Sequence, residues 1–370
     1  LLCRTVKREL HTATVYHLDD VTKIRYHPRL MATLDWKTMP RPIVALSPMA
    51  DMTDSAFCRV AREVAHDASD LIVFREMVSA EAVVRGNDKT LGMTAIHDDE
   101  RPLVQQIFGS DPTTMAEAAR IIEADHHPEG FDINMGCPVY KLVHNFNGCA
   151  LMNDAQRAGD IVRAVKAVIT VPLSVKIRLG WDDPTQCINF AKALEAAGAD
   201  MLTVHGRTKA QGYSGVADWE MVGRVKAAVN IPVLVNGDIH TAEKVQTALA
   251  ASQADGVLIA RGALGNPWIF RDINDVLAGR TPTPITFGER MTVVRRHLAL
   301  HVQQYGATSV PLFRKHLSWY FKGMPGMKSF KDPMMKAMTV DELESVFAQF
   351  EADHDANDAT TFRPALLTKK

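Results

Sequence analysis

The chain alternates between short apolar runs and longer amphipathic stretches. Eight short runs rich in Val, Ile and Leu recur between residues 43 and 260, and each has the length and composition of a buried strand. The predicted strands are Ile43–Ser47, Leu71–Phe74, Leu103–Phe108, Phe131–Asn134, Leu173–Ile177, Met201–His205, Val233–Asn236 and Gly256–Ala260. The predicted helices between them include Met115–Glu123, Ala155–Val168, Cys187–Ala197, Trp219–Ala228 and Ala242–Ala251. Eight strand–helix repeats over roughly 220 residues predict an α/β protein with a (β/α)8 TIM barrel.

An open, doubly wound sheet is the alternative fold for such an alternation. That fold would carry a glycine-rich G-x-G-x-x-G turn after its first strand. Here the segment Pro48-Met49-Ala50-Asp51 follows the first run, and it contains no glycine. The pattern therefore favours the closed barrel.

The pattern changes after Trp268. The segment Leu277–Thr286 contains Gly279, Pro282 and Pro284 and is predicted to be a linker. Only helical periodicity follows, in stretches such as Glu289–Gln304 and Val340–Phe350. We therefore expect a small C-terminal all-helical domain after the barrel. The expected divisions are an N-terminal extension of unknown role at 1–40, the barrel at 41–280, the helical domain at 286–352 and a tail at 353–370.

Composition narrows the class of protein only a little. Hydrophobic residues make up 46% of the chain and charged residues 23%, and the formal net charge is −1. Whole-chain charge therefore gives no sign of a nucleic-acid partner, and such a partner would need a local basic patch. The predicted helical domain contains one, in which a single acid, Asp332, accompanies Arg314, Lys315, Lys322, Lys328, Lys331 and Lys336.

The five cysteines are widely spaced and form no C-x-x-C pair, so neither a metal site nor a disulfide framework is predicted. Free thiols favour a reducing, cytoplasmic location. No apolar run reaches the ~18–20 residues that a membrane span needs. The first 30 residues also lack the apolar segment of a secretory signal. We therefore expect no bound metal and no membrane association.

Candidate chemistry lies where the predicted strands end, because TIM-barrel active sites form at the C-terminal ends of the strands. Polar or distinctive residues end or directly follow nearly every run: Pro48-Met49-Ala50, Glu76, Gln106, Asn134 with Cys137, Lys176, His205 with Arg207, Asn236-Gly237-Asp238 and Arg261-Gly262. The last two groups are glycine turns after strands 7 and 8, where barrels bind phosphate through backbone N–H groups. Arg261 can add a charge-assisted contact. These turns predict a phosphate-bearing ligand.

Cys137 lies between Gly136 and Pro138, just after the fourth run. Its thiol can be a nucleophile, a metal ligand or a proton donor. A metal ligand is disfavoured because no second Cys or His lies at ligand spacing. A nucleophile with His144 or His205 as base, and a proton donor, both remain open. The other cysteine candidates, Cys149 and Cys58, are predicted to be packed residues.

Several motifs together resemble the tRNA-dihydrouridine synthase family, in particular its bacterial B-type branch. They are DINMGCPVYK at 132–141, VKIRLG at 175–180, VHGRTKAQGYSGVADW at 204–219, VNGDI at 235–239 and ARGALGNPWIF at 260–270. The combination of G-C-P-x-x-K with H-G-R-T-x-x-Q-x-Y-x-G is specific to that family. The resemblance covers about residues 41–340. One departure is Ala260, where the family often has glycine, and a positive φ there would cost about 1 kcal/mol.

The resemblance implies a bound FMN and assigns residues to it. Pro48, Met49 and Ala50 would lie under the flavin, with Gln106 and Lys176 at the isoalloxazine ring. The ribityl and phosphate end would be held by His205, Asn236, Gly237, Asp238, Arg261 and Gly262. Cys137 is implied to be the general acid, with Lys141 a nearby catalytic lysine. Expected substrate contacts are Asn134, Arg178, Arg207, Tyr213, Arg314 and Lys315.

The implied reaction is reduction of the C5=C6 bond of specific uridines in tRNA. NADPH or NADH would reduce the flavin, flavin N5 would deliver hydride to C6, and Cys137 would protonate C5. The helical domain would bind tRNA, and the protein is expected to be a monomer. Two alternatives stay open: another FMN barrel reductase acting on a free pyrimidine or an enone, and a non-catalytic RNA-binding barrel.

Overall fold

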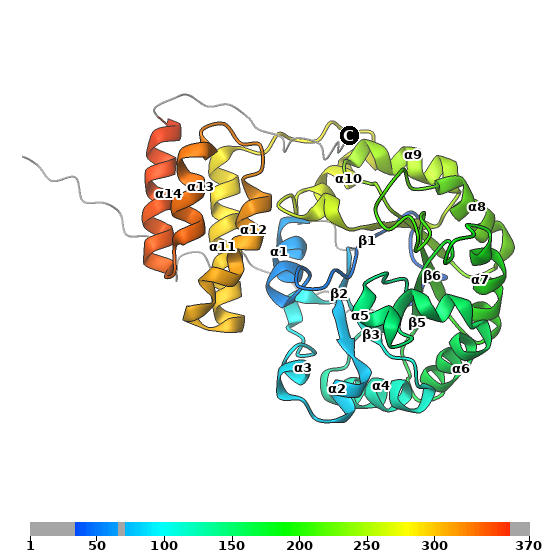
Figure 1. The fold of residues 1–370 in the computed structure, drawn as a ribbon. Helices are drawn as coiled ribbons and strands as arrows, with labels where there is room; N and C mark the ends of the chain where they lie inside the picture. Colours follow the sequence, from blue (N-terminus) through cyan, green and yellow to red (C-terminus); the bar gives the residue numbers. More distant parts are fainter. Residues whose placement is uncertain (1–33, 66–70, 356–370) are drawn as a thin grey trace, which may run out of the picture.

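Residues 34–65 and 71–355 are described by the structure, a computed structural model (Figure 1). Most of the predicted N-terminal extension and most of the predicted tail lie outside the described residues. Of the described helices, none combines the length and the hydropathy that crossing a lipid bilayer requires.

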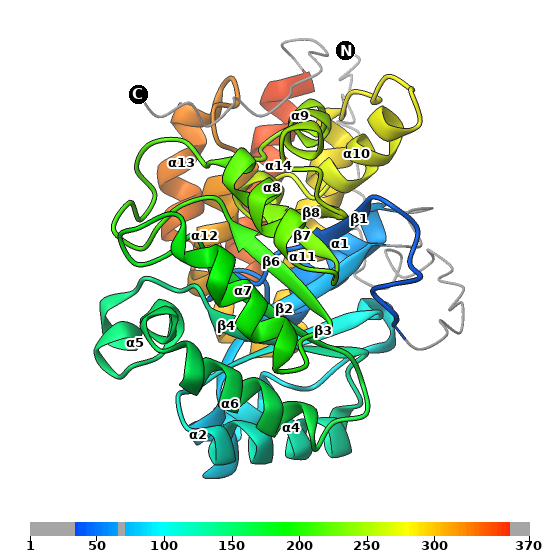
Figure 2. The ribbon, with the colours of Figure 1, turned by 90° about the vertical axis from the view of Figure 1, so that its right-hand side faces the viewer.

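Eight parallel strands close into a barrel in sequence order (Figures 1 and 2). The strands are β1 Ile43–Leu46, β2 Ile72–Ser79, β3 Leu103–Phe108, β4 Gly130–Met135, β5 Leu173–Arg178, β6 Met201–His205, β7 Val233–Asn236 and β8 Gly256–Ile259. β1 pairs with β8 over four residues, from Ile43 opposite Gly256 to Leu46 opposite Ile259. The predicted TIM barrel is confirmed, and the open sheet is excluded because the first and last strands are hydrogen-bonded.

Helices surround the barrel and pack their apolar faces on the outward side chains of the strands. The α-helices are α1 Ser55–Ala65, α2 Ala80–Val84, α3 Asp88–Gly92, α4 Pro112–His126, α5 Tyr140–His144, α6 Ala155–Lys166, α7 Gln186–Ala196, α8 Trp219–Ala228, α9 Ala242–Ser252 and α10 Ile269–Leu277. Short 3₁₀ turns are η2 Asp98–Glu100, η3 Gly148–Asn153 and η4 Arg261–Ala263. Helix starts follow capping chemistry: Asp154 and Asp218 each accept the N–H three residues later, at 2.9 and 2.8 Å.

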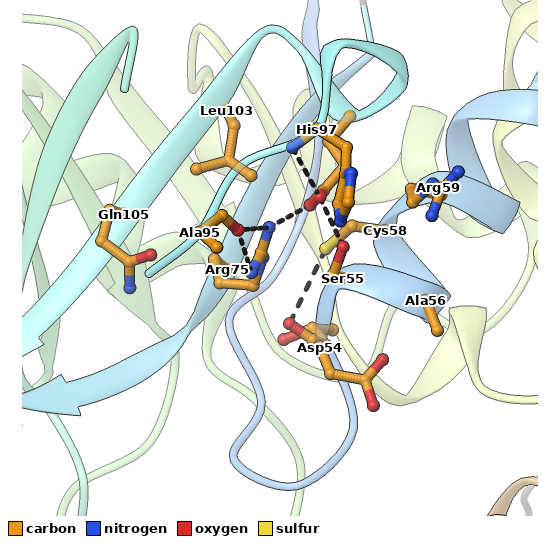
Figure 3. Close-up of polar contacts among 12 residues, drawn as sticks. Asp54, Ser55, Ala56, Cys58, Arg59, Arg75, Ala95, His97, Leu103 and Gln105 are labelled. Carbon is orange, nitrogen blue, oxygen red and sulfur yellow. Dashed lines mark hydrogen bonds and ion pairs between the residues drawn. The ribbon is translucent and has the colours of Figure 1, made fainter. Parts of the chain in front are cut away.

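Strand β2 is longer than the sequence pattern predicts. The predicted run ended at Phe74 because Arg75 and Glu76 follow it, yet β2 continues to Ser79. Arg75 is buried at the side of the barrel, where its guanidinium forms an ion pair with the buried carboxylate of Glu100 (Figure 3). The charge is tolerated inside the protein because it has a partner 25 residues later in the chain.

The C-terminal helices form a bundle beside the barrel, as predicted (Figure 1). They are α11 Phe287–Tyr305, η5 Ala307–Ser309, α12 Val310–Tyr320, α13 Met327–Lys336 and α14 Val340–Asp355. The bundle has its own apolar core, which also takes in Ala56, Val60 and Val64 of α1 and Trp268. The two units are therefore joined by a packed interface as well as by the linker.

Gly265 lies at this interface in the left-handed region, with φ +64. Its carbonyl accepts a hydrogen bond from the buried Arg290 at 3.2 Å, and the backbone of Trp319 and Tyr320 occupies the space where a Cβ would project. Substituting Gly265→Ala should lower the free energy of unfolding by about 1–3 kcal/mol through overpacking and by about 1 kcal/mol through backbone strain. Urea denaturation measures the loss.

Gly279→Ala is the matched control for this prediction. Gly279 has a similar φ of +72, but nothing lies within 4 Å of the position of its Cβ. The control should therefore show only the loss from backbone strain. Equal losses in the two variants would contradict the packing argument for Gly265.

Candidate functional site

A cavity of about 440 Å³ opens at the C-terminal ends of the strands, a volume typical of small-ligand sites. It is lined by most of the site residues that were predicted from the sequence: Pro48, Met49, Ala50, Gln106, Asn134, Cys137, Lys176, Arg178, His205, Tyr213, Asn236, Gly237, Asp238 and Arg261. The barrel brings them together because parallel strands all end at the same face.

Five predicted site residues do not line this cavity: Lys141, Arg207, Gly262, Arg314 and Lys315. Lys141 is exposed on α5, a few residues beyond Cys137. Gly262 lies behind the cavity wall, where a Cβ would meet the carbonyl oxygen of Ile239 at 2.6 Å. The side chains of Arg207, Arg314 and Lys315 make contacts within the protein, which are described below.

A chain of hydrogen bonds runs along the inner wall to the Cys137 turn. The amide of Gln106 donates to Asp132 Oδ2 at 2.6 Å, and Gln106 Oε1 accepts from Asn134 at 3.0 Å. Asn134 Oδ1 in turn accepts the backbone N–H of Cys137 at 2.9 Å. Burial raises the pKa of Asp132 to about 6. The chain fixes the Asn134 amide, and with it the backbone that carries the thiol.

Arg178 ties this turn to the opposite rim of the cavity. Its Nε donates to the carbonyl of Gly136 at 2.9 Å, and its Nη1 donates to the carbonyls of Thr208 and Gly212 at 3.0 and 2.8 Å. The Arg178 guanidinium also lies 5.7 Å from the centroid of the Tyr213 ring. Arg178, for which the family resemblance implied a substrate contact, therefore donates hydrogen bonds to three backbone carbonyls of the protein itself.

Lys176 presents a cation to the cavity. Within the described residues, no hydrogen bond or ion pair engages its ammonium group. Burial, and then the neighbouring Arg178, lower the pKa of Lys176 to about 8. His205 lies near it, and burial together with the positive charge of Lys176 lowers the pKa of His205 well below its usual range. A half-buried cation that no direct ion pair neutralises suits an anionic or electron-rich ligand.

The turns after β7 and β8 are held by a charged cluster. Asp238 has φ +56, and its Oδ2 accepts from Arg207 at 2.6 Å and from the N–H of Ala217 at 2.8 Å. The pKa of Asp238 is lowered, because these hydrogen bonds together outweigh the effect of burial, which by itself would raise it. Arg261 lies 3.6 Å from Asp238 Oδ1 and keeps about a third of its side chain exposed. Arg207 therefore positions the turn, and Arg261 stays accessible to a ligand.

Glycine is required at the β7 turn. Gly237 has φ +114, and a Cβ there would meet the His205 ring at 2.9 Å. The departure at Ala260 carries no such strain, because its φ is −102. The positive φ and the close His205 ring therefore both require glycine at position 237.

The segment Pro48–Asp51 is clamped from two sides. Glu76 Oε2 accepts the N–H of Asp51 at 2.6 Å, and the ammonium of Lys315, from α12, donates to the Asp51 carbonyl. Burial raises the pKa of Glu76 to about 7. The clamp fixes a left-handed residue, since Asp51 has φ +62. A predicted tRNA contact, Lys315, thus links the helical bundle to the wall of the cavity.

The sequence reasoning missed several cavity residues, including Met77, His240, Leu264 and Trp319. Trp319 comes from α12, in the bundle. No signal in the sequence places a residue of a separate helical unit against the barrel mouth. Cys149 is buried as expected, its N–H donates to the Cys137 carbonyl at 3.1 Å, and burial raises the pKa of its thiol to about 11.

Fold and site together define a TIM-barrel protein with a ligand cavity at the strand ends and one cysteine at its mouth. A model of the dihydrouridine synthase family matches residues 44–357, so the chain belongs to this family. It is 40% identical over 290 residues to tRNA-dihydrouridine synthase B of Pseudomonas syringae pv. tomato, covering 77% of this chain and 84% of the relative.

A second relative is the probable tRNA-dihydrouridine synthase of Rickettsia conorii. It is 37% identical over 292 residues, which cover 78% of this chain and 87% of the relative. Among solved structures, a 2-naphthoyl-CoA reductase complex matches with a TM-score of 0.49 at 13% identity. That match covers 68% of this chain and 51% of the reductase chain.

Proposed function

We propose that this protein is an FMN-dependent tRNA-dihydrouridine synthase that reduces the C5=C6 bond of specific uridines in tRNA, with NADPH or NADH as the electron source. The observation that carries the proposal is the Cys137 turn, fixed by Asn134 at the mouth of a cavity that also holds the unpaired cation of Lys176. Membership of the dihydrouridine synthase family supports the same activity.

The residues present fit an FMN. Lys176 offers a positive charge to the electron-rich edge of the isoalloxazine ring, and the Gly237 turn with Arg261 offers backbone N–H groups and a guanidinium to the phosphate. Pro48, Met49 and Ala50 provide a wall held rigid by the Asp51 clamp. Reduced FMN, when bound, supplies the hydride that adds to C6 of the uracil ring.

Cys137 supplies the proton that completes the reduction. Its thiol donates H⁺ to C5, so hydride and proton together add across the double bond, and the thiolate then takes a proton from solvent. Asn134 and Arg178 hold the backbone of this turn at the cavity mouth. We place Lys141, on the adjacent helix α5, near the uracil oxygens, where its charge would stabilise the developing enolate.

The tRNA backbone would bind along the exposed basic side of the bundle. Arg314 donates to the carbonyl of Ala337 at 2.9 Å and Lys315 is used in the Asp51 clamp, so both act within the fold. Lys322, Lys328, Lys331 and Lys336 are exposed, and in the described part of the chain no ion pair engages them. These exposed lysines can contact phosphates, and binding through them should weaken as salt rises.

A direct test uses purified protein and unmodified tRNA. The protein should carry a flavin that mass spectrometry identifies as FMN, and NADPH should drive formation of dihydrouridine in the tRNA. Free uridine and small enones should be poor substrates. This result would distinguish the proposed function from that of an FMN barrel reductase acting on a free pyrimidine or an enone. Reduction of free uridine as fast as of tRNA, or RNA binding without any reduction, would overturn it.

The lowered pKa of Lys176 predicts how FMN binding depends on pH. The ammonium loses its proton as the pH rises through about 8, and only the charged form attracts an electron-rich ligand. The affinity for FMN should therefore fall about tenfold between pH 7 and pH 9. Quenching of FMN fluorescence by the apoprotein measures it. Lys176→Met is the control: it should bind more weakly at pH 7 and show no step near pH 8.

A further inference from the structure

Exposed apolar side chains gather at the rim of the cavity. Ten large apolar residues of the described chain are exposed, and half of them lie on the two segments that flank the mouth. These five are Val139, Tyr140 and Phe146 on the Cys137 side and Tyr213 and Val216 on the other. Single exposed apolar residues are ordinary, but a cluster beside a cavity marks a binding surface.

Tyr140 differs from the other aromatic residues of this rim. Arg157 lies 5.3 Å from the centroid of the Phe146 ring, and Arg178 and Arg261 lie 5.7 and 5.1 Å from that of Tyr213. Tyr140 is 79% exposed, and among the described residues its one aromatic neighbour is His144. Its outer ring face is therefore open to a partner.

The Tyr140 and His144 rings form a flat pair. They lie one helical turn apart on α5, with ring centroids 5.6 Å apart and an interplanar angle of 18°. A stacked pair of this kind favours one orientation of the Tyr140 ring. The exposed surface of the pair has the shape and size that a nucleic-acid base stacks on.

Position and charge favour RNA as the partner. Tyr140 follows Cys137 by three residues, a span of at most roughly 11 Å, and Pro138 and Val139 between them line the cavity. The segment 133–153 contains no Asp or Glu and carries Lys141 and His144. In Figure 2, α5 and α13 project on the same side of the molecule, so a polyanion along the bundle would pass this rim.

We propose that the Tyr140 ring, backed by His144, is a stacking platform for an RNA base next to the uridine that enters the cavity. This inference rests on the proposed function, because it assumes that a uridine leaves its stack to reach Cys137. Moving that uridine out removes a stacking partner from its neighbour. The platform replaces the lost contact and makes the segment after Cys137 part of substrate recognition.

The test compares variants in steady-state reduction of tRNA. Tyr140→Ala should raise the KM for tRNA about tenfold, while FMN content and NADPH oxidation without tRNA stay at the wild-type level. Tyr140→Phe keeps the ring and should behave like the wild type. Val168→Ala, exposed just beyond the end of α6 and outside the residues that line the cavity, is the control for a general loss of exposed apolar surface and should also behave like the wild type.

Fluorescence separates stacking from a merely structural role. In a tRNA with 2-aminopurine next to the target uridine, binding of wild type and Tyr140→Phe should quench the fluorescence, and Tyr140→Ala should not. An unchanged KM in Tyr140→Ala, or a Tyr140→Phe variant as weak as Tyr140→Ala, overturns the platform while the proposed function stands. A wild-type protein that forms no dihydrouridine overturns both.

Discussion

Replacing Cys137 with alanine should lower the rate of uridine reduction by about 10²–10⁴-fold, the usual contribution of a positioned acid. FMN content and NADPH oxidation should stay near the wild-type level, because the thiol lies at the mouth and makes none of the contacts proposed for the flavin phosphate. Hydride addition to C6 without a proton for C5 leaves an enolate that reverts. Single-turnover reduction of tRNA by the pre-reduced enzyme measures the chemical step directly.

Cys149→Ala is the matched control for this experiment. Cys149 is buried beside Cys137, and its backbone N–H, which an alanine keeps, donates to the Cys137 carbonyl. Burial raises the pKa of the Cys149 thiol to about 11, which makes it a poor acid at neutral pH. This variant should keep most of the activity. Full turnover by Cys137→Ala, or loss of activity in Cys149→Ala alone, would exclude Cys137 as the acid.

Replacing Glu100 with alanine should lower the free energy of unfolding by about 3–5 kcal/mol. The side chain is buried and forms an ion pair with Arg75, while its Oε1 accepts hydrogen bonds from the Ser55 hydroxyl and the His97 N–H (Figure 3). Without Glu100 the Arg75 guanidinium is left buried with only the carbonyls of Met93 and Ala95. Urea or thermal unfolding measures the loss.

Two further variants separate the charge from the packing. Arg75→Met combined with Glu100→Leu removes both charges and should recover most of the lost stability, because apolar pairs often replace buried ion pairs without cost. Glu117→Ala breaks an exposed pair with Arg120 and should leave stability nearly unchanged. A double variant as unstable as Glu100→Ala would show that shape, not charge, is what the site requires.

The barrel could be predicted from sequence because its strands are buried on both faces. Continuous apolar runs follow from that burial, and β3, β6 and β7 have the predicted bounds. β2 was cut short at Arg75, whose partner Glu100 cannot be found by local reasoning. Helices α2, α3 and α5 were not predicted, because a helix of five residues is too short to show helical periodicity in the sequence.

The candidate site could be predicted as far as the barrel architecture determines it. Residues near the C-terminal ends of strands, such as Lys176 and Asn236, line the cavity because every parallel strand ends at the same face. The partners of charged residues could not be predicted, because they depend on how distant loops meet. Arg178 and Arg207 both follow the same pattern in the sequence, an arginine at or after a strand end. Arg178 lines the cavity, whereas the Arg207 side chain donates to the carbonyl of Ser214 in a loop. Their proposed substrate contacts stay predictions.

Trp319 has a consequence for how this protein could be divided or redesigned. Since Trp319 of α12 lines the chamber, a fragment ending at the linker would retain Cys137 but lose this part of the pocket wall. Exchanging the bundle for that of a relative would reshape the entrance while every strand-end residue stayed in place. Selection of the target nucleotide could then change during evolution without any alteration of the chemistry.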